Sequence, residues 1–505
     1  MSSSVGTKHV QTKGRQSLFN LLCTSWKTVL ICGALVSYSC YTFYSSDHPK
    51  RPTNSIPDLT SKEILHQPNS STNDDYQDLS PTNINHLRFG IVGSEVTWRG
   101  RKGFVEAWWR PNFTQGYLYL DQSPTGDLLP WPSSFPPFRV LDDQTELINE
   151  IKPAVPTLAR VLHAIYEILK EEEGKTETES FRWLVMGDDD TVFFVDNLVD
   201  VLSEFNHTKY WYIGGVSESI LTNFLLSFNM AFGGAGFVLS YPLAKAFAQN
   251  FESCLRRYSQ LETGDFIEMS CVADIGVNLS PHKGLHQIDL HGDISGLLSS
   301  HPMTPLVSLH NFDAVEPIFP GMDRIQSINH LMKAGNIAGG QQSRLMQQTI
   351  CHHRRHNWTI SVSWGYSVHI YEKIMPRSLL QLPLQTFGPW VSNPDPPFYR
   401  FNTRLPSREP CDAPHVFFFE SIEKPPSDDE DFVVLSSYYR SSPRDLPPCV
   451  DGEHSADYVT HIHVHSPATK PIEKDRCECC DIESTKGMKN AIVKFRECMP
   501  GEIIA

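Results

Sequence analysis

The chain has 505 residues, and 40% of them are hydrophobic, which is enough apolar material for a large core and more than one domain. Its formal net charge is -15. Contacts to phosphates need clustered Lys and Arg, and the sequence has no long basic stripe after its N-terminus. We therefore do not expect nucleic acid as a partner.

The N-terminal segment differs from the rest of the chain. Residues 1–27 contain Lys and Arg but no Asp or Glu, and the uncharged run TVLICGALVSYSCYTFY follows at 28–44. As a helix this run rises about 25 Å, near the lower limit for a bilayer span. We expect a cytosolic tail at 1–27 and a transmembrane signal anchor at 28–46, which makes a type II membrane protein. A cleaved signal peptide is the alternative, and the long basic region argues against it.

The sequence after this segment has lumenal features. Residues 47–85 are rich in Ser, Pro, Asn and Asp without an apolar period, and they predict a flexible stalk. Five Asn-x-Ser/Thr sequons and nine of the twelve Cys lie beyond the predicted span. Most of these Cys should pair in an oxidising compartment, and their odd number leaves at least one unpaired within the chain. CECC at 477–480 suggests a metal knuckle or disulfides, and the lack of a second suitable pair favours disulfides.

Strands alternate with helices in the first half of the lumenal part. Apolar runs predict strands at 87–94, 116–121, 182–187 and 210–215, and a short strand after a Gly-rich turn at 232–236. Helices are expected at 98–109, at 156–173 with one apolar face, at 197–205, and from near Pro242. This alternation predicts an α/β layer with a mainly parallel sheet.

The pattern changes after about residue 350. The runs WTISVSWGYSVHIYE, HVFFFESI and DFVVLSSYYR are typical of strands, and Pro-rich connections separate them. No helix of comparable clarity follows. We expect a second, β-dominated region here, built as a sandwich and tied together by the C-terminal Cys.

Three consecutive carboxylates, Asp188, Asp189 and Asp190, directly follow the buried strand in WLVMGDDDTVFF. Ligands of open α/β sheets bind at the carboxyl ends of strands, which is where these side chains stand. Carboxylates there can hold Mn²⁺ or Mg²⁺, and the ion can then hold a diphosphate. The alternative is that they cap the following helix or form an Asx turn. Their position directly after an apolar strand favours the metal.

Three segments downstream add candidate residues. Gly233 and Gly234 in FGGAGFVLS allow backbone to approach a ligand, or they form a tight turn. Asp265 stands at the start of a predicted helix, where it could deprotonate an acceptor hydroxyl or cap the helix. His310 ends the apolar run VSL and is a candidate metal ligand, although a lone His is more often structural.

These motifs resemble one family when they are taken together. WLVMGDDDTVFF, GGAGFVLS, the Gly-Asp segment and VSLHNFDAVEPIFP occur in the order found in Fringe-like glycosyltransferases. The chain looks most like the plant Fringe-related branch, which carries a domain of unknown function, over roughly 85–500. The resemblance implies a GT-A, Rossmann-like domain at 86–350 and a β-rich region at 351–505. It also implies a Golgi membrane protein whose catalytic part is lumenal.

The resemblance implies an inverting transfer of galactose or N-acetylglucosamine, in a β1,3-type linkage, from a UDP-sugar to a glycan or glycoprotein acceptor with Mn²⁺ or Mg²⁺. By position, Asp190 and His310 would hold the metal. Asp188 and Asp189 would contact the nucleotide sugar or the waters of the ion, with Gly233 and Gly234 near the ligand. Asp265 would be the catalytic base.

The sequence departs from the pattern of the family at two positions near the candidate site residues. Many relatives have a second acidic residue where this chain has Phe266, and a second His where it has Asn311. The resemblance implies a disulfide between Cys254 and Cys271, on either side of Asp265. Because of the two departures, the alternative reading is a catalytically weak or inactive lumenal protein that binds glycans or acts as a scaffold.

Overall fold

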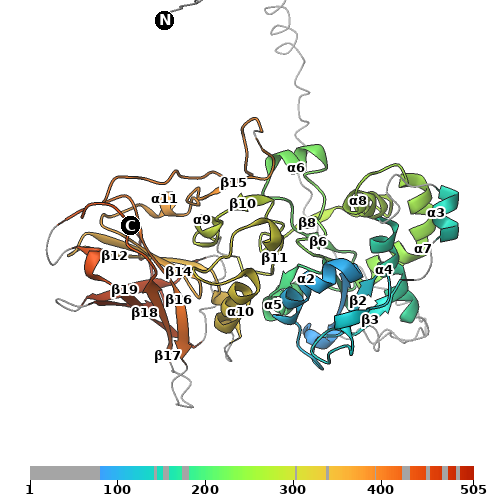
Figure 1. Cartoon of the computed structure of the whole chain (residues 1–505), viewed down its shortest axis with the longest axis horizontal. Helices are drawn as coiled ribbons and strands as arrows, with labels where there is room; N and C mark the ends of the chain where they lie inside the picture. Colours follow the sequence, from blue (N-terminus) through green and yellow to red (C-terminus); the bar gives the residue numbers. More distant parts are fainter. Residues whose placement is uncertain are drawn as a thin grey trace, which may run out of the picture. The chain divides into compact units, whose positions relative to one another are not determined.

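The structure is a computed structural model of the whole chain (Figure 1). It describes residues 80–141, 145–151, 158–172, 181–301, 304–336, 341–392, 394–423, 433–450, 455–468, 476–484 and 489–504. The predicted tail and signal anchor, and the stalk up to residue 79, lie outside these residues. None of the helices in the described ranges has the length and apolar character that a bilayer span needs. Residues Gln77–Ala505 form one compact unit, to which all of the following applies.

A seven-stranded sheet forms the first half of this unit, in the order β3-β2-β1-β4-β7-β6-β8. Its strands are β1 (Leu87–Val92), β2 (Gly116–Leu120), β3 (Phe138–Val140), β4 (Trp183–Asp188), β6 (Tyr212–Gly214), β7 (Phe237–Ser240) and β8 (Leu279–Pro281). All neighbours pair in parallel except at β7, which runs antiparallel to both β4 and β6. The sheet is therefore mainly parallel, as the alternation of elements predicted.

Both faces of this sheet are buried, which explains the uninterrupted apolar run in β4. Trp183 and Val185 belong to one core cluster, whereas Leu184 and Met186 belong to a second cluster. Successive side chains of a strand point to opposite faces, so the two clusters cover the two sides of the sheet. All four residues of WLVM are apolar because each of them packs against a core cluster on one face or the other.

All but one of the helices on this sheet lie close to positions predicted from the sequence, and the exception, Thr145–Ile151, was not predicted. They are α2 (Glu95–Glu106), α3 (Thr145–Ile151), α4 (Leu158–Glu171), α5 (Val195–Ser203), α7 (Tyr241–Tyr258) and α8 (Gly264–Asp274). Helix α2 begins three residues earlier than expected because Ser94 caps it, accepting a hydrogen bond from the Thr97 amide at 3.0 Å.

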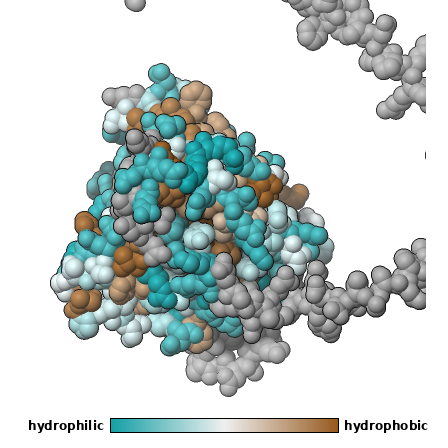
Figure 2. Space-filling view, turned by 90° about the vertical axis from the view of Figure 1, so that its right-hand side faces the viewer, coloured by the Kyte–Doolittle hydropathy of each residue, from teal (hydrophilic) through white to brown (hydrophobic). Residues whose placement is uncertain are grey.

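Figure 2 shows a face on which polar side chains predominate and apolar ones appear in small groups, as expected of an outer surface.

Short elements connect the seven-stranded sheet to the second half. Strands β5 (Val192–Phe193), β11 (Ser308–Leu309) and β9 (Leu285–His286) form a three-stranded sheet in that order, and β10 (Leu290–Gly292) pairs with β15 (Phe387–Pro389). The helices of this region are α6 (Ile220–Leu225), α9 (Ser295–Leu298) and α10 (Arg324–Gly335). The small β5-β11-β9 sheet matters most, because it positions the candidate site described below.

The second half contains one eight-stranded sheet, in the order β12-β13-β14-β16-β17-β18-β20-β19. Its strands are β12 (Gln348–His353), β13 (Trp358–Ser363), β14 (Ser367–Tyr371), β16 (His415–Glu423), β17 (Val433–Arg440), β18 (His461–Pro467), β19 (Cys479–Ser484) and β20 (Asn490–Arg496). The expected sandwich is wrong, because these strands form a single sheet. Its two end strands, β12 and β19, lie side by side and are joined by the Cys351–Cys480 disulfide (Figure 1).

One hydrophobic cluster extends through both halves, from Phe89 in β1 to Val464 in β18. The two halves therefore share a core.

Eight of the nine Cys beyond the predicted span form four disulfides. The ninth, Cys477, is buried and has a free thiol. The pairs are Cys254–Cys271, Cys351–Cys480, Cys411–Cys449 and Cys479–Cys498. The implied Cys254–Cys271 pair is therefore confirmed, and CECC contributes to disulfides.

Candidate metal and catalytic site

Asp188, Asp190 and His310 converge in the structure. One ligand atom from each side chain lies within 4.8 Å of the others. Asp188 ends β4 and Asp190 stands in the turn that follows, whereas His310 comes directly after β11. Strand β11 pairs with β5, the strand that begins two residues after Asp190, so the small sheet brings His310 to the acidic turn. His310 lies more than a hundred positions after Asp190 in the sequence, and the pairing of β11 with β5 brings the two together.

His310 is oriented by a hydrogen bond on its other ring nitrogen. Its Nδ1 lies 3.1 Å from the carbonyl oxygen of Gln287, which can only accept, so Nδ1 donates. This leaves Nε2 facing the carboxylates, 3.3 Å from Oδ1 of Asp190. A backbone carbonyl that fixes the tautomer in this way is the usual companion of a metal-ligating imidazole.

Asp190 has the character of an ion ligand. It is 1% exposed, and neither of its carboxylate oxygens takes part in a hydrogen bond. Its nearest cationic groups are His310 and Arg101, whose Nη2 lies 3.3 Å from Oδ2. A buried carboxylate without hydrogen bonds is costly unless something else satisfies it. Two carboxylates and one imidazole are a donor set that fits Mn²⁺ or Mg²⁺.

Asp189 points away from this group and ties the turn to helix α2. The Thr97 hydroxyl donates to its Oδ2, and Nη1 of Arg101 lies 3.0 Å from its Oδ1. Arg101 also bonds to Asp313, so one guanidinium contacts three carboxylates. This Arg provides much of the positive charge that three adjacent Asp require. Arg101 was not among the predicted site residues, although the basic WRGRKG segment was a visible signal.

Gly233 and Gly234 were expected to face a ligand, and their first role in the structure is to make room for side chains. A Cβ on Gly234 would collide with the imidazole of His310, and one on Gly233 would lie 2.8 Å from Oδ1 of Asp265. Both contacts are closer than real Cβ atoms tolerate. The third glycine of the segment, Gly236, has φ of +79°, a left-handed conformation that favours glycine.

Asp265 lies beside Asp188 in a cavity of about 280 Å³. It is not the cap of α8, because that role belongs to Thr263, whose hydroxyl accepts from the Phe266 amide at 3.3 Å. Burial raises the pKa of Asp265 to about 6, against a weaker opposing effect of the Gly233 amide. A carboxylate with a pKa in this range suits a general base near neutral pH.

The other ionisable groups of the site are also shifted. Burial raises the pKa of Asp188 to about 7, although the nearby His310 opposes this shift. Burial alone would lower the pKa of His310, but Asp190 outweighs it and raises that pKa to about 9. The pKa of Asp190 is lowered in turn, because His310 and Arg101 overcome its burial. Strongly coupled shifts of this kind concentrate at functional sites.

The fold and the site define a class: a mixed α/β protein of the GT-A type with a carboxylate and imidazole cluster at the carboxyl end of a central strand. The model of a Fringe-like domain matches residues 148–289, and the model described as "Protein of unknown function, DUF604" matches residues 222–480. The latter covers just over half of the chain, which therefore belongs to the DUF604 family. A comparison with the curated proteins finds no match to this sequence.

The Fringe-like match indicates a glycosyltransferase in general terms, with a nucleotide-sugar donor and a glycan acceptor. The two matched regions overlap at 222–289, so Gly233, Gly234 and Asp265 lie in both of them. The Fringe-like region contains the acidic triplet, Gly233, Gly234 and Asp265, whereas His310 lies in the DUF604 region alone. The candidate site is thus completed by a residue beyond the Fringe-like match.

Proposed function

We propose that this protein is a Golgi-type inverting glycosyltransferase that uses Mn²⁺. In this proposal it transfers galactose or N-acetylglucosamine from UDP to a glycan or glycoprotein in a β1,3-type linkage. The convergence of Asp188, Asp190 and His310 beside the partly buried Asp265 is the observation that carries it. The cluster supplies donors for a divalent ion, and the neighbouring carboxylate supplies a base.

Each residue has a distinct part in the proposed reaction. Asp188, Asp190 and His310 would hold the ion, which neutralises the charge on the departing diphosphate when it is bound. Asp265 accepts the proton of the acceptor hydroxyl as that oxygen attacks the anomeric carbon from the face opposite UDP. The Gly233 amide favours the ionised form of Asp265, although burial has the larger, opposite effect on its pKa. A single displacement of this kind inverts the anomeric carbon without a covalent enzyme intermediate.

The two departures from the family pattern have structural explanations that leave the site intact. Phe266 packs against an apolar cluster of Met230, Phe232 and Ala235. Asn311 has φ of 71°, a left-handed conformation that Asn adopts more readily than most residues. With Phe266 and Asn311 present, His310 still meets Asp188 and Asp190, and Asp265 still lines a cavity with Asp188, which supports an active enzyme over the inactive scaffold.

We further propose that the chain is a single-pass type II protein of the Golgi membrane, anchored by residues 28–46. The support comes from the basic tail, the uncharged run and the sequons of the sequence. The four disulfides fit an oxidising lumen.

The proposal is tested with the purified full-length chain in detergent, Mn²⁺ and a panel of UDP-sugars, with UDP release and product linkage as the readouts. We expect release with at least one galactose or N-acetylglucosamine donor and acceptor, and its loss in Asp190→Ala. Manganese-dependent binding of UDP without turnover of any donor would favour the scaffold alternative. Release that persists in Asp190→Ala would contradict the metal role.

A further inference from the structure

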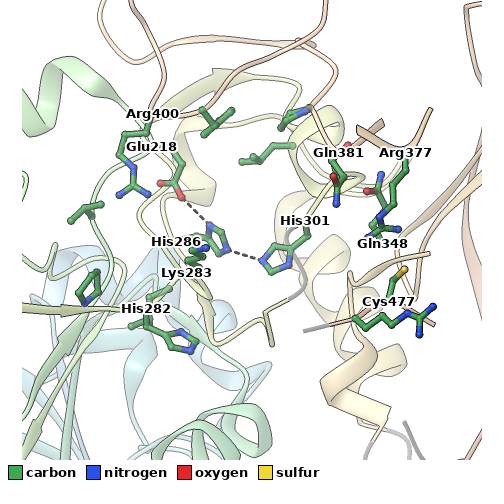
Figure 3. A pocket seen from close by; sticks show the side chains of 18 of the residues that line it. Glu218, His282, Lys283, His286, His301, Gln348, Arg377, Gln381, Arg400 and Cys477 are labelled. Carbon is green, nitrogen blue, oxygen red and sulfur yellow. Dashed lines mark hydrogen bonds and ion pairs between the residues drawn. The ribbon is translucent and has the colours of Figure 1, made fainter. Parts of the chain in front are cut away.

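A second cavity, of about 760 Å³, lies apart from the carboxylate and imidazole cluster. None of the residues proposed above to bind metal or act as a base lines it. Figure 3 shows its walls: Glu218, His282, Lys283, His286 and Arg400 stand on one side, and Gln348, Arg377, Gln381 and Cys477 stand on the other. The first wall belongs largely to the loops after β6 and β8, and the second to α11 (Arg377–Leu380) and the start of the eight-stranded sheet.

Both carboxylates that line this cavity already have partners. Glu218 accepts a hydrogen bond from the Ile288 amide at 2.7 Å and lies 2.8 Å from Nδ1 of His286. Glu502 forms an ion pair with Arg496 at 2.7 Å. Both acids are thus engaged by groups other than Lys283, Arg377 and Arg400.

The cations in the cavity are not balanced. In the described part of the chain, no carboxylate pairs with Lys283, Arg377 or Arg400. Nη1 of Arg377 is buried and has no hydrogen-bond partner there. A buried guanidinium nitrogen without an acceptor is costly, and a bound anion would satisfy it. The cavity thus presents an excess of positive charge on both of its walls.

Hydrogen-bonding groups and apolar surfaces complete the cavity. Two of the lining imidazoles are hydrogen-bonded to each other: Nε2 of His286 lies 2.8 Å from Nε2 of His301 (Figure 3). Gln381 and Ser300 also face the cavity, and amides and hydroxyls of this kind bind sugar hydroxyls. Leu297 and Phe401 supply apolar surface, and the flat ring of Phe401 suits the face of a sugar ring.

We propose that this cavity binds a saccharide that carries a carboxylate, that is, a uronic acid. The forked guanidinium groups of Arg377 and Arg400 match a carboxylate, which each can bind through two nitrogens. The volume lies in the range of cavities that hold small organic ligands. The choice of a sugar among organic anions rests on the proposed glycosyltransferase function, whereas the requirement for an anion rests on the cavity alone.

The test measures binding by isothermal titration calorimetry to the full-length chain, without metal or UDP. The probes are a disaccharide of a uronic acid, a neutral disaccharide of the same size and inorganic phosphate. Arg377→Gln and Arg400→Gln each remove one cation from the cavity. Arg408→Gln is the matched control, because Arg408 is exposed and does not line the cavity. Thermal melting confirms that each variant is folded.

We expect the uronic acid probe to bind, with a loss of affinity of about tenfold or more in both cavity variants and none in Arg408→Gln. The neutral disaccharide should bind at least tenfold more weakly. Binding of phosphate but not of the uronic acid would overturn the assignment of a sugar, and binding that ignores both cavity variants would overturn the site. Manganese-dependent UDP binding, measured separately in the same variants, shows whether the proposed function itself fails.

Discussion

Gly234 and His310 are packed so closely that glycine is the one residue type that leaves room for the imidazole ring. The same ring is held from its other side by the carbonyl of Gln287. These two contacts fix the orientation of His310, with Nε2 directed at Asp190. The imidazole can occupy this position only because Gly234 has no side chain.

Gly234→Ala should displace His310 and weaken Mn²⁺ binding by roughly 10- to 100-fold, the range seen when the support of a metal ligand is lost. Metal affinity is measured by calorimetry. Gly100→Ala is the matched control, because a Cβ built at Gly100 in helix α2 meets no atom within 4 Å apart from its chain neighbours and the adjacent backbone of the helix. Equal Mn²⁺ affinity in Gly234→Ala and the native protein would show that His310 is not a ligand.

Asp189 and Asp190 are adjacent in sequence, but we expect opposite results from their substitution. Asp190→Asn should lower Mn²⁺ affinity by on the order of 100-fold or more, because it removes a charged ligand that lacks hydrogen bonds. Asp189→Asn should change it by less than about tenfold, because Asp189 contacts Thr97 and Arg101 instead. A larger loss in Asp189→Asn than in Asp190→Asn would reverse the proposed roles.

The proposed reaction should require the ionised form of Asp265. Because burial raises its pKa to about 6, the base is mostly protonated below that pH and mostly ionised above it. Turnover should thus rise with pH through about 6 and level off near neutrality. Asp265→Asn should abolish this rise and lower kcat, while Mn²⁺-dependent UDP binding stays within about threefold. An unchanged kcat in that variant would exclude Asp265 as the base.

The Cys254–Cys271 disulfide joins α7 to α8, the helix that begins beside Asp265. Replacement of both Cys by Ala should lower the free energy of unfolding by about 3 kcal/mol, the entropic value for a loop of this size. Chemical denaturation measures the change. Cys477→Ala, which removes the free buried thiol, should cost less. A similar decrease in the free energy of unfolding in the double Cys variant and in Cys477→Ala would show that the disulfide itself contributes little.

Arg344 and Glu478 form a buried ion pair with two bonds of 2.7 and 2.8 Å, linking the segment before β12 to the residue before β19. Arg344→Met leaves the Glu478 charge buried alone and should cost about 3–5 kcal/mol of stability. Combining it with Glu478→Leu should recover part of that loss. A double-mutant cycle on denaturation midpoints measures the coupling, and strict additivity of the two changes would contradict the pair.

The first half of the fold was predictable because its signals are local. The apolar run before Asp188, the periodic face of α4 and the Pro near the start of α7 each fix an element within a few residues. The antiparallel direction of β7 was not predictable, since its pairing with β4 and β6 is set by tertiary contacts. The same holds for the eight-stranded sheet, whose end strands meet through Cys351 and Cys480.

The residue types of the site were predictable, and their arrangement was not. The separate directions of Asp188 and Asp189 follow from the turn after β4, and the contacts of Arg101 depend on how α2 packs against that turn. The large cavity escaped prediction for the same reason, because its Lys and Arg come from segments far apart in the sequence that only folding brings together.

The central claim is that a divalent ion held by Asp188, Asp190 and His310 binds the diphosphate of a UDP-sugar. Calorimetric titration of the full-length chain with UDP, with and without Mn²⁺, tests it most directly. We predict UDP binding that requires Mn²⁺ in the native protein and is lost in Asp190→Asn. UDP binding of equal strength without the ion, or undiminished in Asp190→Asn, would contradict the claim.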